Sequence, residues 1–261
     1  MGVKSLLDLT GRTALVTGGS RGLGLQIAEA LSELGARVAL VARKDDELGA
    51  AKAHLASAWH ADALTLRCDL ADAKAIAPMV ARAEEALGPI DILVNNAGAT
   101  WGAATVDLPL EAWHKVIHLN LTAMFLVTQE VGRRSMLPRR QGRVINVASI
   151  LGLGGGQPDE RRAPTLAYNT SKAGVVNFTR SLAVEWGGYN VNVNAIAPGF
   201  FPTRMTRGVL QAMGNDLARR VPLQRVGGAE DLKGIVAVLA SDAGAFITGQ
   251  TIAVDGGVTA M

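Results

Sequence analysis

The stretch TALVTGGSRGLG, residues 13–24, decides the fold, because it joins a short apolar run to an amphipathic helix through a loop of glycines. The run Thr13–Thr17 is rich in strand-forming residues, and apolar residues recur at helical spacing from Leu23 to Leu34. Gly35 follows the last of them and is typical of a helix end. The stretch therefore predicts a strand, a tight turn and a helix in direct succession.

The same alternation of apolar strand and amphipathic helix continues along the chain. Further strands are expected at 37–42, 64–68, 90–94, 143–147, 191–196 and 251–254, and further helices at 44–58, 72–87, 109–137, 164–186 and 229–240. Continuous apolar strands are typical of a parallel sheet that helices cover on both faces. We therefore expect residues 1–261 to form a single-domain α/β protein with a doubly wound (Rossmann) parallel sheet of about seven strands.

Two segments interrupt this alternation. Residues 152–164 are rich in glycine, proline and charge, and we expect an inserted loop there. Residues 198–222 make a long excursion between the sixth expected strand and the next helix, and we expect this segment to act as a lid over a substrate. Long irregular insertions in α/β domains are usually functional.

The composition narrows the class of protein. A chain of 261 residues with 49% hydrophobic and 19% charged residues is typical of a globular protein. A formal net charge of +3, without a long basic run, argues against a nucleic-acid partner. The chain has no apolar run long enough to cross a membrane and no signal peptide at its start. Cys68 is the only cysteine, and no Cys and His cluster has metal-ligand spacing. We expect a cytoplasmic protein without a metal site.

Gly18, Gly22 and Gly24 lie at the junction of the first strand and the first helix. A sharp turn, a close approach of the backbone to a pyrophosphate, and tight packing of the helix against the strand each disfavour a side chain. The amino end of the helix then offers free amides to the phosphates. The loop therefore predicts a dinucleotide-binding site, and a merely flexible turn is the alternative.

The end of the second expected strand favours NADP(H) over NAD(H). An acidic residue at this point would bind the ribose 2′-hydroxyl and repel a 2′-phosphate, but Ala42 and Arg43 stand here. Arg21, in the glycine loop, can approach the same point, and guanidiniums suit a phosphate. The alternative is that Arg43 only begins a solvated helix. Asp69 is placed to accept the adenine amino group, unless it caps the helix that begins at 72.

Tyr168 and Lys172 lie four residues apart in an expected helix, so both side chains can point at one site. A nearby ammonium favours phenolate over phenol, so Lys172 would lower the pKa of Tyr168 from its usual value of about 10. The spacing alone is common in unrelated proteins. It gains weight from Ser149, which follows the fifth strand at the edge of the sheet where ligands bind.

These residues together resemble the short-chain dehydrogenase/reductase superfamily over nearly the whole chain, from about Leu9 to Gly257. The motifs are TGGSRGLG (17–24), Asp69-Leu70, NNAG (95–98), Asn120, Ser149, YNTSK (168–172), PGFFPT (198–203) and VDGG (254–257). NNAGATWGA and PGFFPTRMT are most similar to bacterial 3-oxoacyl reductases and gluconate 5-dehydrogenases. One departure is that the interval from Ser149 to Tyr168 is longer than is common in the family.

The resemblance implies roles for particular residues. Tyr168 would exchange a proton with the substrate oxygen, Ser149 would hydrogen-bond that oxygen, and Lys172 would bind the nicotinamide ribose. Asn120 would organise a water that relays protons to Lys172, unless it is only a structural polar residue. The residues implied in binding NADP(H) are Gly18, Ser20, Arg21, Gly22, Leu23, Gly24, Arg43, Asp69, Leu70, Asn96, Ala97, Gly98, Tyr168, Lys172, Pro198, Gly199, Phe201 and Thr203.

The resemblance further implies an oxidoreductase that transfers a hydride between NADP(H) and a small-molecule ketone or secondary alcohol, as a carbonyl or 3-oxoacyl-type reductase. A sugar-acid oxidoreductase similar to gluconate 5-dehydrogenase is the alternative, and a non-catalytic NADP-binding scaffold or sensor is a remote one. The apolar side chains that would flank the substrate, or else pack in the core, are Trp101, Phe200, Phe201 and Met205. Arg204 and Arg207 would suit an acidic carrier or a carboxylate. We also expect a homotetramer, as is usual in the family.

Overall fold

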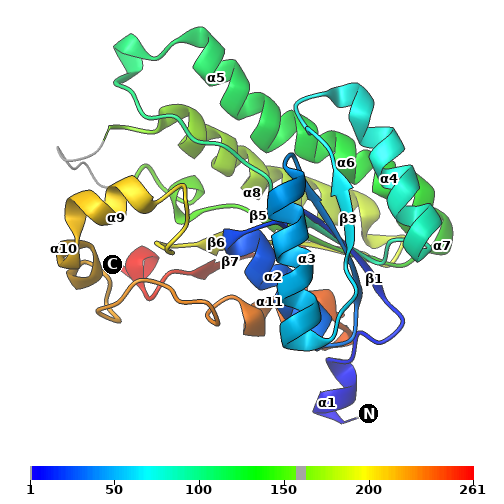
Figure 1. The fold of residues 1–261 in the computed structure, drawn as a ribbon. Coiled ribbons are helices and arrows are strands. Elements are labelled where there is room, and N and C mark those ends of the chain that lie inside the picture. Colours follow the sequence, from blue (N-terminus) through cyan, green and yellow to red (C-terminus); the bar gives the residue numbers. More distant parts are fainter. Residues whose placement is uncertain (1, 157–162) are drawn as a thin grey trace.

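Seven parallel strands build one sheet in the computed structural model, which describes residues 2–156 and 163–261 (Figure 1). The strands are β1 (Thr13–Thr17), β2 (Arg37–Ala42), β3 (Leu64–Arg67), β4 (Ile92–Asn95), β5 (Gly142–Val147), β6 (Val191–Pro198) and β7 (Thr251–Val254). Their order is β3-β2-β1-β4-β5-β6-β7, so the direction of winding reverses between β1 and β4. The expected doubly wound α/β sheet is confirmed, and in such folds ligands bind at this reversal.

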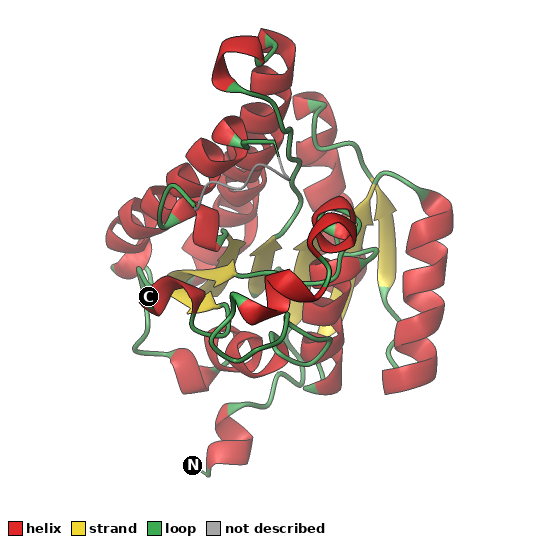
Figure 2. Ribbon diagram, turned by 90° about the vertical axis from the view of Figure 1, so that its left-hand side faces the viewer, coloured by secondary structure: helices red, strands yellow, loops and turns green. Residues whose placement is uncertain are grey.

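Helices cover both faces of the sheet (Figures 1 and 2). The helices α2 (Gly22–Glu33), α3 (Asp45–Trp59) and α11 (Lys233–Ala240) contribute to one core layer, and α4 (Ala73–Leu87), α6 (Ala123–Val131) and α8 (Leu166–Gly187) to the other. Successive side chains of β1 point to opposite faces of the sheet, so Ala14 and Val16 pack in the first core layer and Leu15 packs in the second. A continuous apolar strand is therefore buried on both sides, as its sequence predicts.

The region expected to form one helix over 109–137 is helical but irregular. After α5 (Leu110–Ile117), the chain passes through a π-helical segment (His118–Thr122) into α6. A second π-helical segment (Gly132–Met136) then leads into the short α7 (Leu137–Arg139). Such segments are rare and often occur at functional sites. The first of them contains Asn120, a predicted site residue.

The segment 198–222 is partly helical, which the sequence did not predict. It holds α9 (Arg207–Met213) and α10 (Asn215–Arg219), while the short α1 (Val3–Leu6) lies near the start of the chain. Of the inserted loop expected at 152–164, residues 157–162 lie outside the described residues. The division of the chain into a single domain stays a prediction.

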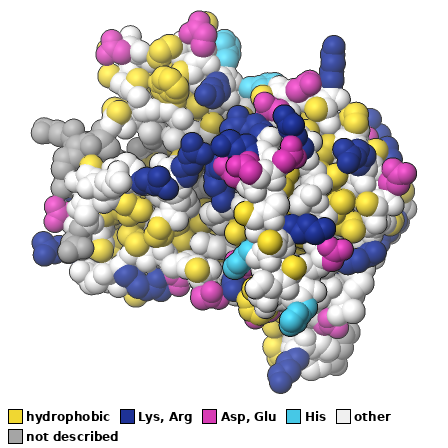
Figure 3. All heavy atoms as spheres, in the orientation of Figure 1, with side chains coloured by type: hydrophobic (Ala, Val, Ile, Leu, Met, Phe, Trp, Pro, Cys, Tyr) yellow, Lys and Arg dark blue, Asp and Glu magenta, His cyan; other side chains and the backbone are white. Residues whose placement is uncertain are grey.

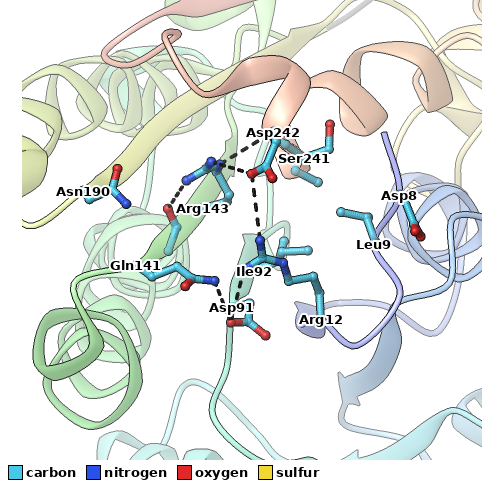
Figure 4. Close-up of a pocket in the computed structure, with 12 residues that line it drawn as sticks. Asp8, Leu9, Arg12, Asp91, Ile92, Gln141, Arg143, Asn190, Ser241 and Asp242 are labelled. Atoms are coloured by element: carbon cyan, nitrogen blue, oxygen red, sulfur yellow. Dashed lines mark hydrogen bonds and ion pairs between the residues drawn. The ribbon is translucent and has the colours of Figure 1, made fainter. Parts of the chain in front are cut away.

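An ion-pair network surrounds a small cavity at the amino-terminal edge of the sheet (Figure 4). Asp91, which precedes β4, is buried, and its Oδ1 accepts a hydrogen bond of 2.7 Å from Nη2 of Arg139. Nη1 of Arg12 lies 3.9 Å from Oδ1 of Asp91, and its Nη2 lies 3.9 Å from Oδ1 of Asp242. Nη2 of Arg143, on β5, donates to the same Asp242 oxygen at 3.2 Å. This edge is thus held by ion pairs between three arginines and two aspartates.

Candidate active site

The glycine loop after β1 has the backbone conformation that its glycines predict. Gly18 and Gly22 have φ angles of +64° and +55°, which residues with a side chain rarely adopt. A Cβ atom at Gly24 would lie 2.2 Å from the carbonyl oxygen of Gly18, so only glycine fits there. No side chain caps the start of α2, and its first amides are therefore available to an anion.

Asn96 fastens β4 to the glycine loop across the reversal point of the sheet. Its Nδ2 donates hydrogen bonds to the carbonyl oxygens of Thr17 at 3.0 Å and of Gly18 at 3.1 Å. The backbone amides of Asn96 and Ala97 both donate to Oγ1 of Thr17, at 3.0 and 3.2 Å. Thr17 was not predicted as a site residue, and its place at the start of the TGG motif is the signal that was available.

The cluster of charges near the end of β2 differs in part from the prediction. Arg21 forms an ion pair with Glu47, and Nζ of Lys44 lies 3.4 Å from Oε1 of the same carboxylate. Arg43 is exposed and has no ion pair within the described residues. The sequence did not predict that Arg21 pairs with Glu47. Glu47 comes close to the glycine loop only once the chain has folded and α3 lies beside that loop.

Asp69 does not cap the helix α4, which was the alternative role that the sequence left open for it. Its Oδ1 accepts a hydrogen bond of 3.1 Å from the amide of Ala71, and the residue is exposed. Asp72 instead caps α4, since its Oδ1 accepts from the amide of Lys74 at 3.0 Å. The side chain of Leu70 is buried in the core. Asp69 therefore does not cap α4, and its predicted contact with the adenine stays a prediction.

Ser149, Tyr168 and Lys172 meet at the carboxyl end of β5. The side chain of Ser149 lies close enough to the phenol of Tyr168 to act on its pKa as a hydrogen-bond partner. Nζ of Lys172 lies 5.7 Å from the centre of the Tyr168 ring and donates a hydrogen bond of 2.6 Å to the carbonyl oxygen of Val147. Gly152 allows this approach, because a Cβ there would lie 2.5 Å from the carbonyl carbon of Lys172. The predicted triad is thus assembled by close packing of α8 on the turn after β5.

Burial dominates the pKa values of this group. It raises the pKa of Tyr168, while the hydrogen bond with Ser149 acts in the opposite direction. Burial also lowers the pKa of Lys172 to about 8. The predicted lowering of the Tyr168 pKa by Lys172 is therefore wrong: the ammonium donates to a backbone carbonyl, and removal of the phenol from water outweighs it.

Asn120 joins three elements through both ends of its amide. Its Oδ1 accepts a hydrogen bond of 2.8 Å from the amide of Ala99, and its Nδ2 donates to the carbonyl of Ala99 at 3.0 Å and to Oγ of Ser171 at 2.8 Å. Ser171 Oγ in turn donates to the carbonyl of Tyr168 at 2.7 Å. The side chain thus positions the helix that carries Tyr168 and Lys172; the predicted water relay stays a prediction. Ser171 was missed, although it lies inside the YNTSK motif.

The end of β6 closes the site from the other side. A Cβ at Gly199 would lie 2.8 Å from Cα of Asp255, so β6 and the end of β7 approach closely after Pro198. Phe201 is buried in the core, which is the alternative that the sequence left open for it, whereas Trp101 and Met205 are exposed. Thr203 hydrogen-bonds Thr206 and lies against the glycine loop.

The residues at this edge fit a dinucleotide. A Cβ added at Gly18 or Gly24 would lie within 3 Å of Asn96, so the loop turns without side chains and leaves the first amides of α2 uncapped for phosphates. A Cβ at Gly98 would lie 3.1 Å from Oδ1 of Asn120 and 3.8 Å from Nζ of Lys172. The described residues contain no group of three His, Cys, Asp or Glu side chains that could hold a metal ion. Among the described helices, none has the length and apolar character needed to span a membrane.

The chain matches known proteins over almost its full length. The family profile described as enoyl-(acyl carrier protein) reductase covers residues 18–259. The rhamnolipids biosynthesis 3-oxoacyl-[acyl-carrier-protein] reductase of Pseudomonas aeruginosa is 41% identical over 256 residues, which are 96% of this chain and 97% of that protein. Gluconate 5-dehydrogenase of Gluconobacter oxydans is 36% identical over 259 residues, which are 97% of each chain.

Solved structures agree with this relationship. A short-chain type dehydrogenase/reductase from Mycobacterium marinum superposes with a TM-score of 0.93 at 35% identity and covers 100% of both chains. The RhlG/NADP active-site complex of Pseudomonas aeruginosa superposes with a TM-score of 0.87 at 39% identity and covers 97% of this chain and 98% of that one. The chain therefore belongs to the short-chain dehydrogenase/reductase family and is an oxidoreductase that acts on CH–OH and C=O groups.

Proposed function

We propose that this protein transfers a hydride between NADP(H) and a ketone or secondary alcohol, as a carbonyl or 3-oxoacyl-type reductase. The observation that carries the proposal is the meeting of Tyr168 with Ser149 and with the buried Lys172 beside the glycine loop. A non-catalytic scaffold is disfavoured, because both the tyrosine and the lysine are present and positioned. The relatives named as 3-oxoacyl reductases support the substrate class.

The chemistry divides between the cofactor and the chain. The nicotinamide supplies the hydride to the carbonyl carbon. Tyr168 gives its phenolic proton to the carbonyl oxygen, which becomes the alcohol oxygen, and Ser149 hydrogen-bonds that oxygen as charge develops on it. Lys172 binds the nicotinamide ribose, and its pKa of about 8 suits it to return a proton to Tyr168 near neutral pH. In the oxidative direction Tyr168 takes the proton.

NADP(H) is the cofactor that the charges near the end of β2 favour. Arg21 and Lys44 lie there, and Arg43 follows the strand directly. A 2′-phosphate is attracted by this surplus of cations, and a 2′-hydroxyl is not. The Pseudomonas relative whose complex with NADP superposes on this chain supports the same choice.

A sugar-acid substrate is the second candidate. Gluconate 5-dehydrogenase of Gluconobacter oxydans aligns over 97% of the chain, and Arg204 and Arg207 in the segment 198–222 would suit a carboxylate. The apolar Trp101 and Met205 are exposed at the same end of the molecule and suit an acyl chain better. The lid role of the segment 198–222 is part of this proposal.

A substrate panel tests the proposal. The absorbance of NADPH should fall when β-ketoacyl thioesters are added, and keto sugar acids and small diketones are assayed beside them. Tyr168→Phe is the control, because it removes the acid and keeps the ring. Equal rates for the two proteins would refute the catalytic assignment, and turnover of keto sugar acids alone would favour the second candidate.

We also propose a homotetramer in the cytoplasm. Apolar side chains project from α6 and from the long helix α8, where Phe125 and Val184 are exposed, and Phe246, which precedes the edge strand β7, is fully exposed. Exposed apolar surface of this kind suits contacts between identical copies. Sedimentation velocity at micromolar concentration should show one species of four chains, and a monomer would refute the assembly.

A further inference from the structure

The carboxylate of Glu47 gathers polar groups from three separate segments of the chain. From the glycine loop it receives Arg21 and the hydroxyl of Ser20, whose Oγ lies 3.5 Å from Oε2. From the start of α3 it receives Lys44, and from the segment 198–222 it receives Arg204, whose Nη1 lies 3.9 Å from Oε1. Three cations thus surround one part-exposed carboxylate.

The cluster stands at the ribose end of the cofactor cradle. Glu47 lies in the first turn of α3, which directly follows β2. The amides of Gly18 and Gly19 donate to the carbonyl oxygen of Val41 at 2.8 and 3.3 Å, so the end of β2 touches the glycine loop. In Figure 3, Lys and Arg side chains gather with acidic ones between the segment 198–222 and the start of α3. This is the point where a doubly wound fold reads the adenine ribose.

The charges of the cluster do not cancel. Three cations against one carboxylate leave a surplus of two positive charges. A phosphate monoester carries close to two negative charges at neutral pH and has three acceptor oxygens. Arginine binds such a group through two parallel donors. The surplus therefore matches a 2′-phosphate, while the carboxylate of Glu47 opposes it.

We propose that Arg204 is a third cation that reads the 2′-phosphate, and that Glu47 is an internal counter-ion which the phosphate replaces. This rests on the proposed use of NADP(H). Arg204 comes from the segment 198–222, which also touches the glycine loop one residue earlier: a Cβ at Gly22 would lie 3.6 Å from Cγ2 of Thr203. The phosphate of the cofactor therefore fastens this segment against the glycine loop, and NAD(H) does not.

Binding of two small fragments to the full-length protein separates the phosphate from the rest of the cofactor. Isothermal titration with 2′,5′-ADP and with 5′-AMP should show that Glu47→Gln binds 2′,5′-ADP about two- to fivefold more tightly than the wild type, the range expected for part-exposed charges. Arg204→Gln should bind it about two- to fivefold more weakly. Neither variant should change the affinity for 5′-AMP, which lacks the 2′-phosphate.

Arg207→Gln is the matched control. Arg207 lies three residues further along the same segment, is exposed, and has no ion pair within the described residues, so the substitution changes the net charge equally. It should leave both affinities as in the wild type. Equal weakening by Arg204→Gln and Arg207→Gln would mean a general field effect and would overturn the role of Arg204. Unchanged or weaker binding of 2′,5′-ADP by Glu47→Gln would overturn the role of Glu47.

Hydrogen exchange tests the fastening itself. Amides of residues 203–214 should exchange more slowly when 2′,5′-ADP is added to the wild type, and this protection should be lost in Arg204→Gln at saturating ligand. Protection that persists in the variant would overturn the fastening. A wild type that binds 2′,5′-ADP no better than 5′-AMP would instead refute the proposed use of NADP(H), so the two failures are distinguishable.

Discussion

The two edges of the sheet treat buried charge in opposite ways. At the amino-terminal edge, Asp91 is 6% exposed and is met by Arg139 and Arg12. At the carboxyl edge, Lys172 is 5% exposed, and within the described residues its nitrogen donates to a backbone carbonyl and is met by no carboxylate. One edge neutralises its charges, and the other leaves a charge uncompensated.

The difference has a physical consequence. A buried charge with partners keeps its ionisation and mainly contributes to stability, whereas one without partners moves its pKa toward the neutral form. Burial lowers the pKa of Lys172 to about 8, because no carboxylate within the described residues meets its charge. Strongly perturbed groups gather where proton transfer occurs. The amino edge is therefore interpreted as structural and the carboxyl edge as catalytic, and four experiments can sharpen or break this division.

The largest effect is expected for Tyr168→Phe. The variant loses the proton donor, and the rate should fall about 100- to 10,000-fold, the range for a general acid. The thermal unfolding midpoint near neutral pH should change little, because the phenol is uncharged there in the folded and the unfolded chain and the substitution keeps the ring. NADPH-coupled assays and calorimetry measure the two quantities. A fall in stability large enough to account for the lost rate would mean that Tyr168 has a structural role and not a catalytic one.

Lys172→Met should remove activity and stabilise the fold near neutral pH. The folded-state pKa of about 8 lies below the ordinary 10.5, so the folded protein binds fewer protons than the unfolded chain between these values. The variant should be more stable by up to about 3 kcal/mol below pH 8, and the difference should fade as the pH rises toward 10.5.

Lys233→Met is the control, because the pKa of Lys233 is shifted in the opposite direction and the change in stability should have the opposite sign. Hydrogen bonding to Glu230 and the nearby Glu29 and Glu33 raise the pKa of Lys233 despite its desolvation. That variant should therefore lose stability near neutral pH, as followed by urea unfolding across a pH series. A loss of stability in both variants would show that Lys172 is held like an ordinary paired lysine.

Asp91→Ala should cost about 2 kcal/mol of unfolding free energy, since charged hydrogen bonds are lost inside the protein. Activity at low temperature should stay near the wild-type value, because the site lies at the opposite edge of the sheet. Asp242→Ala is the matched control, since it removes a carboxylate that pairs with Arg12 and Arg143 but is half exposed. Its loss should be under about 1 kcal/mol. Equal losses of unfolding free energy in Asp91→Ala and Asp242→Ala would show that burial does not make the ion pairs of Asp91 more stabilising.

The smallest effect is a displacement of the pH profile in Ser149→Ala. Oxidation requires the phenolate, so its rate rises with pH as Tyr168 loses its proton. The hydrogen bond with Ser149 lowers the pKa of Tyr168 against the effect of burial, and without it the rise should begin at higher pH. A rate–pH series in the oxidative direction measures this, provided that chemistry limits the rate. A lower rate with an unmoved profile would mean that Ser149 acts on the substrate alone.

The order of elements and the placement of Tyr168 and Lys172 on one helix face could be predicted from the sequence because they depend on local rules; the catalytic roles of these residues stay a prediction. Apolar runs and helical spacing follow from the two side-chain periods, and the strands agree with their predicted places to within two residues at every end. The positive φ angles of Gly18 and Gly22 are a local requirement of the tight turn, whereas the close contact of Gly18 and Gly24 with Asn96 exists only in the folded chain. The four-residue spacing of Tyr168 and Lys172 places both on one helix face without any knowledge of the fold.

Only the tertiary structure decided how distant segments act on these residues. The direction of the Tyr168 pKa depends on burial by elements far along the chain, so the local reasoning from Lys172 was wrong. The π-helical segment around Asn120 follows the same apolar pattern as an α-helix, so the sequence did not distinguish the two, and its hydrogen bonds to Ala99 and Ser171 join segments far apart along the chain. At Glu47, the pair with Lys44 follows from their spacing of three residues, but nothing in the sequence records that Arg21 and Arg204 reach the same carboxylate. Burial and charge act through space, and the distances that set them exist only once the chain has folded.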